Sequence, residues 1–197
     1  MASDPVRRKA ARTATIVAVP IALAVLAVSA LAFGGFGSKA PPPEATGPVA
    51  MTTRGLTDDT VQLCQLVIAN LPDSVAGHAR RPVTAGSEQN AAYGDPPITV
   101  ECGTPPPTVG TTDEVFKFVS VGDDGKLYGV CWYPAAGDGR TVWTSVDRTV
   151  PVTVTVPGSP DGSGQLVAPF SVAVGENIPL RDAGAIPTGC SQTPPTS

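Results

Sequence analysis

The hydrophobic pattern of the chain begins with an uncharged stretch that is long enough to cross a membrane. Residues 13–36 contain no charged side chain. The residues before this stretch include four basic side chains: Arg7, Arg8, Lys9 and Arg12. An apolar helix of about 20 residues spans the hydrocarbon layer, and a basic flank stays on the cytoplasmic side. We therefore predict a cytoplasmic basic tail at residues 1–12, a single-pass signal anchor at residues 13–36, and an extracytoplasmic C-terminal domain.

A cleaved signal peptide is the alternative interpretation of the same stretch. Ala30-Leu31-Ala32 has the small residues of a cleavage site. The apolar run is longer than the usual core of a signal peptide, and the apolar Phe33-Gly34-Gly35-Phe36 continues it, which favours an uncut anchor. We expect the cell membrane to be a partner of the anchored chain, whereas cleavage would release the domain. In both interpretations the rest of the chain lies outside the cytoplasm.

Proline and small residues separate the anchor from the region that can fold. Residues 37–55 are rich in Pro, Ala, Thr and Gly, which predicts an extended linker. We expect one domain at residues 56–190 and a flexible tail at residues 191–197. The domain begins with a helix, because Thr57 can cap it and Pro72 can end it. Apolar residues at three- and four-residue steps give this helix a buried stripe: Val61, Cys64, Ile68 and Leu71.

Alternating apolar and polar residues follow this helix. They predict strands at residues 98–102, 115–121, 127–133, 141–146 and 150–156, with a hairpin turn at Gly122-Asp123-Asp124-Gly125. Residues 73–90 read as a polar loop, and Pro151 predicts that the last strand starts at a sheet edge. Apolar residues four apart at residues 166–178 predict a second helix. The fold class is therefore a single compact α+β domain, with a mainly antiparallel sheet of about five strands and two packed helices.

The charge of the chain is uneven. The net charge is −4, from 13 basic and 17 acidic residues. Residues 1–12 hold four of the basic residues and one acidic residue, so the remainder has 9 basic and 16 acidic residues, or −7. Nucleic-acid binding requires a basic face, so this charge excludes nucleic acid as a partner of the outer domain.

Four cysteines, Cys64, Cys102, Cys131 and Cys190, all lie beyond the apolar stretch. Thiols are oxidised outside the cytoplasm, so two disulfides are the natural interpretation. Three pairings are possible. We favour Cys64 with Cys102 and Cys131 with Cys190, because these bonds tie the first helix and the C-terminus to the sheet. The chain has no C-x-x-C pair and no closely spaced zinc ligands, so we expect no redox centre, metal or cofactor.

Several side chains could form a ligand site. His78 is the only histidine and, with Arg80 and Arg81, could act as a base or bind an anion. A solvated loop is the alternative. Asp95 stands in a Gly-Asp-Pro-Pro turn that could aim its carboxylate into a cleft, or the carboxylate could simply cap the turn.

Three aromatic residues are further candidates. Trp132, Tyr133 and Trp143 come from strands that should be neighbours. They could form a shelf that binds a sugar or peptide, or pack in the core.

A combination of short motifs resembles a known family. The motifs are Leu63-Cys64, Leu71-Pro72, Arg81-Pro82-Val83, the run Tyr93 to Ile98, Cys102-Gly103, Gly129-Val130-Cys131-Trp132, the run Trp143 to Arg148, and Val154-Thr155-Val156-Pro157. The chain is similar to the actinobacterial membrane-anchored domain-of-unknown-function 3515 family. This resemblance implies a membrane or exported protein with one domain, and it implies no catalytic residue.

Three hypotheses for function follow. The first is a non-enzymatic cell-envelope domain that binds a partner protein through its surface. The second is a module that binds a small ligand or a cell-wall fragment through Trp132, Trp143 and the Asp95 turn. The third is a hydrolase that uses Asp95 and His78, which requires a cleft that joins these two side chains.

Overall fold

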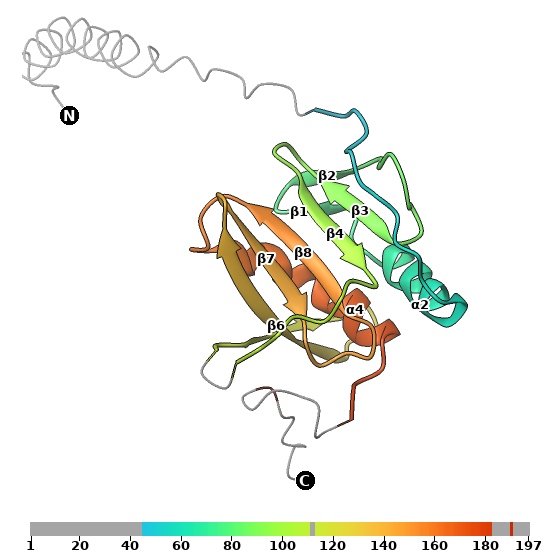
Figure 1. Cartoon of the computed structure of the whole chain (residues 1–197), viewed down its shortest axis with the longest axis vertical. Coiled ribbons are helices and arrows are strands. Elements are labelled where there is room, and N and C mark those ends of the chain that lie inside the picture. The colour runs from blue at the N-terminus through green and yellow to red at the C-terminus, as the bar shows by residue number, and fades with distance from the viewer. Residues whose placement is uncertain (1–44, 111–112, 183–189, 191–197) are drawn as a thin grey trace, which may run out of the picture. The chain divides into compact units, whose positions relative to one another are not determined.

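The structure of the chain is a computed structural model that describes residues 45–110, 113–182 and 190. The predicted tail 1–12, signal anchor 13–36 and C-terminal tail 191–197 lie outside the described residues. No helix within the described part is long and apolar enough to span a membrane. The described residues form an α+β domain with a single antiparallel sheet (Figure 1).

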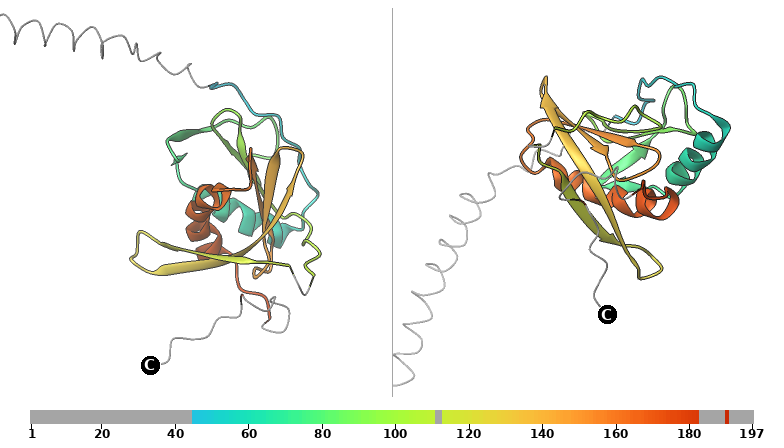
Figure 2. Two further views of the ribbon diagram at one scale, coloured as in Figure 1. Left: turned by 90° about the vertical axis from the view of Figure 1, so that its left-hand side faces the viewer. Right: turned by 60° about the horizontal axis from the view of Figure 1, so that its bottom comes forward.

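The sheet contains eight strands in the order β1-β2-β3-β4-β8-β7-β6-β5. The strands are β1 (Ser74–Val75), β2 (His78–Arg81), β3 (Asn90–Tyr93), β4 (Ile98–Cys102), β5 (Phe116–Val121), β6 (Leu127–Gly137), β7 (Arg140–Ser145) and β8 (Val152–Pro157). The helical segments are α2 (Asp58–Ala69), α3 (Ser163–Val167), the 3-10 turn η1 (Ala168–Phe170) and α4 (Ser171–Asn177). The two views of Figure 2 show the helices gathered on one face of the curved sheet.

The expected count of about five strands is wrong, because β1 and β2 lie in the region predicted as a loop and β3 begins at its last residue. All five predicted strands are present within a few residues of their expected bounds. β2 is largely polar and partly exposed, and all four residues of β3 are buried. Neither strand therefore shows the alternation of apolar and polar residues by which a half-buried strand is recognised.

The position predicted for the last strand is also wrong. β8 pairs with β4 on one side and β7 on the other, so it lies inside the sheet rather than at an edge. Pro151 stands one residue before β8, and its carbonyl accepts bonds from the backbone N–H groups of Gly103 and Thr104. A proline is tolerated there because the missing N–H lies outside the ladder.

The helices follow the predicted pattern in part. Thr57 caps α2 by accepting a bond from the Thr60 N–H at 3.4 Å. The second predicted helix is two short helices joined by η1, because Pro169 cannot donate a backbone hydrogen bond inside a continuous helix. The predicted linker also ends before residue 55, since Val49 forms a bridge with Val83 and is buried.

The core lies between the helices and one face of the sheet, which we call the inner face. Its largest fully buried side chains include Trp132, Tyr93 and Phe170. Both expected disulfides are present, Cys64 with Cys102 and Cys131 with Cys190. The first bond links α2 to β4, and the second links β6 to the C-terminal segment.

Candidate functional site

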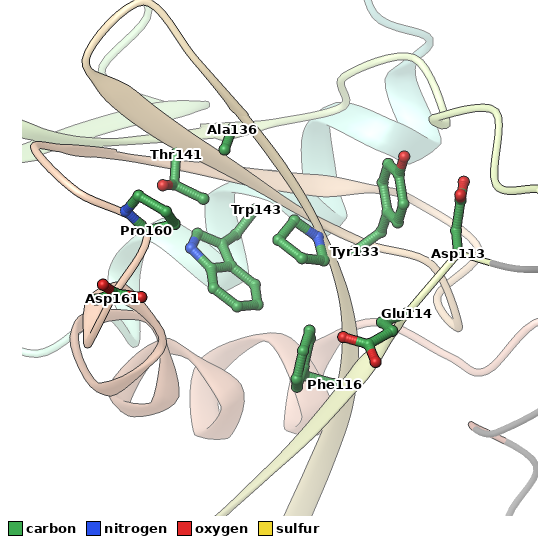
Figure 3. A pocket seen from close by; sticks show the side chains of 10 residues that line it. Asp113, Glu114, Phe116, Tyr133, Ala136, Thr141, Trp143, Pro160 and Asp161 are labelled. Carbon is green, nitrogen blue, oxygen red and sulfur yellow. The ribbon is translucent and has the colours of Figure 1, made fainter.

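A pocket of about 440 Å³ opens beside the β6–β7 hairpin (Figure 3). β5 starts at Phe116, which pairs with Trp132, so β6 runs on beyond the start of β5. The end of β6 therefore pairs with β7 alone. This leaves a space on the inner face of the sheet. Side chains of the segment leading into β5, the β6–β7 hairpin and the loop before α3 surround this space. The lining residues are Asp113, Glu114, Phe116, Tyr133, Pro134, Ala136, Thr141, Trp143, Pro160 and Asp161.

Trp143 forms the aromatic floor of this pocket, which we call the β6–β7 pocket. Its indole N–H donates to Ser163 Oγ at 3.0 Å, and Ser163 Oγ–H donates to the Pro160 carbonyl at 2.8 Å. The rings of Phe116 and Phe118 pack on the indole at centroid distances of 5.7 and 5.4 Å. These contacts fix the orientation of the indole and hold the Pro160 loop against it, so the pocket is shaped before any ligand arrives.

Carboxylates form the rim of the β6–β7 pocket. Asp113 and Glu114 precede β5, Asp161 precedes α3, and all three side chains are exposed. Asp113 accepts a bond from the Gly110 N–H at 2.8 Å. Partial burial, followed by a hydrogen bond to the Asp113 carboxylate, raises the pKa of the Tyr133 hydroxyl above its usual value. None of the ten lining residues is basic.

The hydroxyl of Thr141 is the unusual polar group of this pocket. Thr141 is fully buried, and its Oγ1 has no hydrogen-bond partner among the described residues. A buried polar atom without a partner costs about 1–3 kcal/mol. Figure 3 places Thr141 beside Trp143 and Pro160 on the wall of the pocket.

The two tryptophans have different environments, so they do not form the shelf proposed from the sequence. Trp132 is fully buried, and its indole N–H donates to Ser171 Oγ at 3.2 Å. Trp143 is 5% exposed and lines the β6–β7 pocket. The core interpretation therefore holds for Trp132, while Trp143 combines core packing with a place in the pocket.

Asp95 and His78 lie together at the end of the sheet where β3 turns into β4, away from the β6–β7 pocket. Asp95 is exposed in the turn and forms a cis peptide bond with Pro96. His78 lies against Gly94, where an added Cβ would come within 2.8 Å of the imidazole ring. Neither side chain lines the β6–β7 pocket, so the cleft required by the hydrolase hypothesis is not this one.

Arg80 and Arg81 have structural contacts. Arg80 donates to the carbonyl of Ile68 at 3.0 Å, which joins β2 to the end of α2. Arg81 donates to the carbonyls of Gly94 and Gly47, both at 2.7 Å. Because both guanidinium groups bond to backbone carbonyls, these two side chains hold the domain together in the described structure.

The β7–β8 connection contains a buried ion pair at the end of the Trp143 to Arg148 motif, to which the sequence assigned no role. Arg148 Nε lies 3.4 Å from Asp147 Oδ1, and both side chains are buried. The Arg148 guanidinium donates to the carbonyls of Gly129 and Ile178. Burial raises the pKa of Asp147 and lowers that of Arg148, while each charge opposes the shift of the other. The pair joins β6 to the end of α4.

Sequence reasoning missed most of the residues of the β6–β7 pocket. Only Tyr133 and Trp143 were candidates. Asp113 and Glu114 lie next to a predicted strand, Phe116 lies within that strand, and Asp161 lies in a loop. Charged and aromatic residues are common at such positions. No local signal marks them, because the pocket exists only where β5, β6 and the loop before α3 meet. The described residues contain no cluster of three or more metal-binding side chains.

Comparison with known proteins gives one match. No curated protein and no solved structure matches the chain significantly. The sequence model of the family described as "Protein of unknown function (DUF3515)" matches residues 15–183, which is most of the chain. The chain therefore belongs to the DUF3515 family.

Proposed function

We propose that this chain is a non-enzymatic partner-binding domain, held at the outer face of the cell membrane by its N-terminal segment, and that the β6–β7 pocket is its binding site. The observation that carries this proposal is the preformed pocket, with Trp143 locked in its floor and three carboxylates on its rim. The two disulfides support a location outside the cytoplasm.

Binding rather than catalysis fits the chemistry of the lining residues. The hydrolase hypothesis needs an acid–base pair beside a reacting group. His78 and Asp95 lie elsewhere, and the ionisable groups of the pocket are three exposed carboxylates and the Tyr133 phenol. Aromatic walls with a few placed polar groups are typical of recognition sites.

A small-ligand module is the second candidate, and the size of the pocket favours it. Small-molecule sites commonly have volumes of about 300–1,000 Å³, and the β6–β7 pocket has about 440 Å³. An aromatic floor with carboxylates could hold a cell-wall fragment. Of Trp132, Trp143 and Asp95, the residues first proposed for this role, only Trp143 lines the pocket.

Site-specific photocrosslinking in living cells tests both candidates. A benzophenone amino acid is placed at Ala136, which lines the pocket, or at Ala135, which is the next residue of β6 and is also exposed. Neighbouring residues of a strand face opposite sides of the sheet, so Ala135 is a matched control. We expect a crosslinked protein from position 136 that is absent from position 135, and that is lost when Pro160→Arg blocks the pocket.

The outcomes separate the candidates. A low-mass adduct at position 136, also lost with Pro160→Arg, would favour the small-ligand module over the protein partner. Equal products from positions 135 and 136 would contradict the use of this pocket for binding.

A further inference from the structure

We infer that the group recognised by the β6–β7 pocket is an organic ammonium ion that carries N–H hydrogens. This inference rests on the proposed function, because it names the chemistry of the ligand at the same site. A free amine, a lysine side chain of a protein and the amino group of a wall peptide all share this chemistry. Three independent features of the pocket point to it.

The first feature is the charge of the lining. Asp113, Glu114 and Asp161 give the pocket three carboxylates, and no lining residue is basic. Lys117 is the lysine nearest in sequence to the lining residues. Its side chain lies on the face of the sheet opposite the inner face, where its stem passes over Gly129. The three carboxylates therefore lack a cationic partner within the lining, and their field attracts a positive ligand.

The second feature is the aromatic surface. Phe116 is 39% exposed and stands over Trp143, and Tyr133 lies at the opposite end of the pocket (Figure 3). The face of an aromatic ring attracts a cation, most strongly when the ring is an indole. Rings on the walls and carboxylates on the rim together favour a cation with an apolar stem over a bare metal ion, which prefers oxygen ligands and water.

The third feature is the unpartnered Thr141 hydroxyl. It is buried in the wall of the pocket without a hydrogen-bond partner in the described part of the chain. Oγ1 is covered in the described structure, so an ammonium N–H can donate to it, and remove the cost of leaving it unpaired, once the Thr141 side chain turns toward the pocket. A quaternary ammonium has no N–H, so it cannot make this bond. For this reason we infer a ligand whose ammonium group carries N–H hydrogens.

The test uses indole NMR of the full-length chain in nanodiscs. The chain has two tryptophans, so an indole-¹⁵N sample gives one reporter in the pocket and one in the core. The ammonium probes are butylammonium and Nα-acetyl-lysine amide. The comparison probes are tetramethylammonium, the neutral Nα-acetyl-norleucine amide, and the neutral disaccharide of N-acetylglucosamine.

We expect both ammonium probes to shift the Trp143 indole signal and to leave that of Trp132 unchanged. Glu114→Gln and Asp161→Asn should each weaken binding about 2- to 5-fold, as expected for exposed ion pairs. Asp123→Asn, which removes an exposed charge in the β5–β6 turn, should have no effect. Thr141→Val should weaken butylammonium while leaving tetramethylammonium unchanged. Added salt should weaken binding of every ammonium probe.

Other results would overturn the inference. If norleucine amide or the disaccharide shifts Trp143 as strongly as lysine amide, the ligand class is wrong, but the proposed binding function stands. If tetramethylammonium binds as tightly as butylammonium, the role of the N–H hydrogens is wrong. If no probe shifts Trp143 and the crosslink at position 136 is also absent, the proposed function itself fails. Binding of lysine amide but not of butylammonium would identify a peptide as the source of the ammonium group.

Discussion

At the scale of single residues, burial changes the pKa of the Tyr93 hydroxyl. Tyr93 is fully buried, and its hydroxyl donates to the Pro72 carbonyl at 2.8 Å. Burial raises the pKa of this phenol to about 12, against the usual 10. The proton is therefore held more tightly in the folded state than in the unfolded state.

The raised pKa predicts a loss of stability at high pH. The contribution of the Tyr93 phenol to the free energy of unfolding is fully present below about pH 10. It is lost as the pH rises toward 12, because only the unfolded state then loses the proton readily. We expect wild type to lose about 2 kcal/mol relative to Tyr93→Phe over this range. Urea unfolding of both proteins at a series of pH values measures the difference. A constant difference from pH 9 to 12 would contradict the prediction.

The buried pair of Asp147 and Arg148 makes a second prediction at the residue scale. Arg148→Met should lower the free energy of unfolding by about 3–5 kcal/mol, because it leaves the Asp147 charge buried without a partner. It also removes the donor to the Gly129 and Ile178 carbonyls. Urea unfolding measures the cost.

Arg140→Met is the matched control for Arg148→Met. The Arg140 side chain is 56% exposed, and its nearest contact with Asp138 is 3.9 Å. We expect a change of about 0.5 kcal/mol or less from this substitution. If the two variants lose similar amounts of stability, the buried pair does not have the structural role that we assign to it.

At the scale of elements, the contact of α3 with β5 supports the floor of the β6–β7 pocket. A Cβ added to Gly164 would come within 2.7 Å of Phe118 Cζ. Phe118 in turn packs on Trp143. The absence of a side chain at position 164 therefore lets α3 approach the ring that holds the indole.

Gly164→Ala should lower stability by about 1–3 kcal/mol, because the Phe118 ring must move to make room. It should also shift the Trp143 indole signal more than the Trp132 signal. Gly137→Ala is the control, since no atom lies within 4 Å of a Cβ at that position and its φ is not positive. A gain in stability for Gly164→Ala would show that helix propensity outweighs the clash.

At the scale of the whole molecule, we predict that the N-terminal segment anchors the domain at the membrane. We expect the native protein to be extracted from membranes with residues 1–38 intact and with all four cysteines in two disulfides. Intact mass and peptide mapping without reductant measure both properties. A chain that begins near Phe33 would show that the segment is a cleaved signal peptide. Free thiols would contradict the prediction that all four cysteines form disulfides.

The sequence alone determined the features that depend on neighbouring residues. The cap at Thr57, the burial of Cys64 and Ile68 in α2, the β5–β6 turn and five strands follow from local pattern, because helix and strand periods are set by the backbone. The rest of the predicted stripe differs, since Val61 is half-buried, Leu71 lies beyond the end of α2, and the buried Val67 was not predicted. The preferred cysteine pairing also holds: one bond joins the predicted first helix to a predicted strand, and the other joins a predicted strand to the C-terminal segment.

The tertiary structure decided the features that depend on distant residues. All four residues of β3 are buried, so the strand lacks the alternating pattern of a half-buried strand. β8 lies between β4 and β7, and the local sequence around Pro151 does not show this position inside the sheet. The β6–β7 pocket likewise forms only because β6 extends past the start of β5 and the Pro160 loop folds back on Trp143. Residues far apart in the chain make this site, so its chemistry becomes visible only once the sheet is assembled.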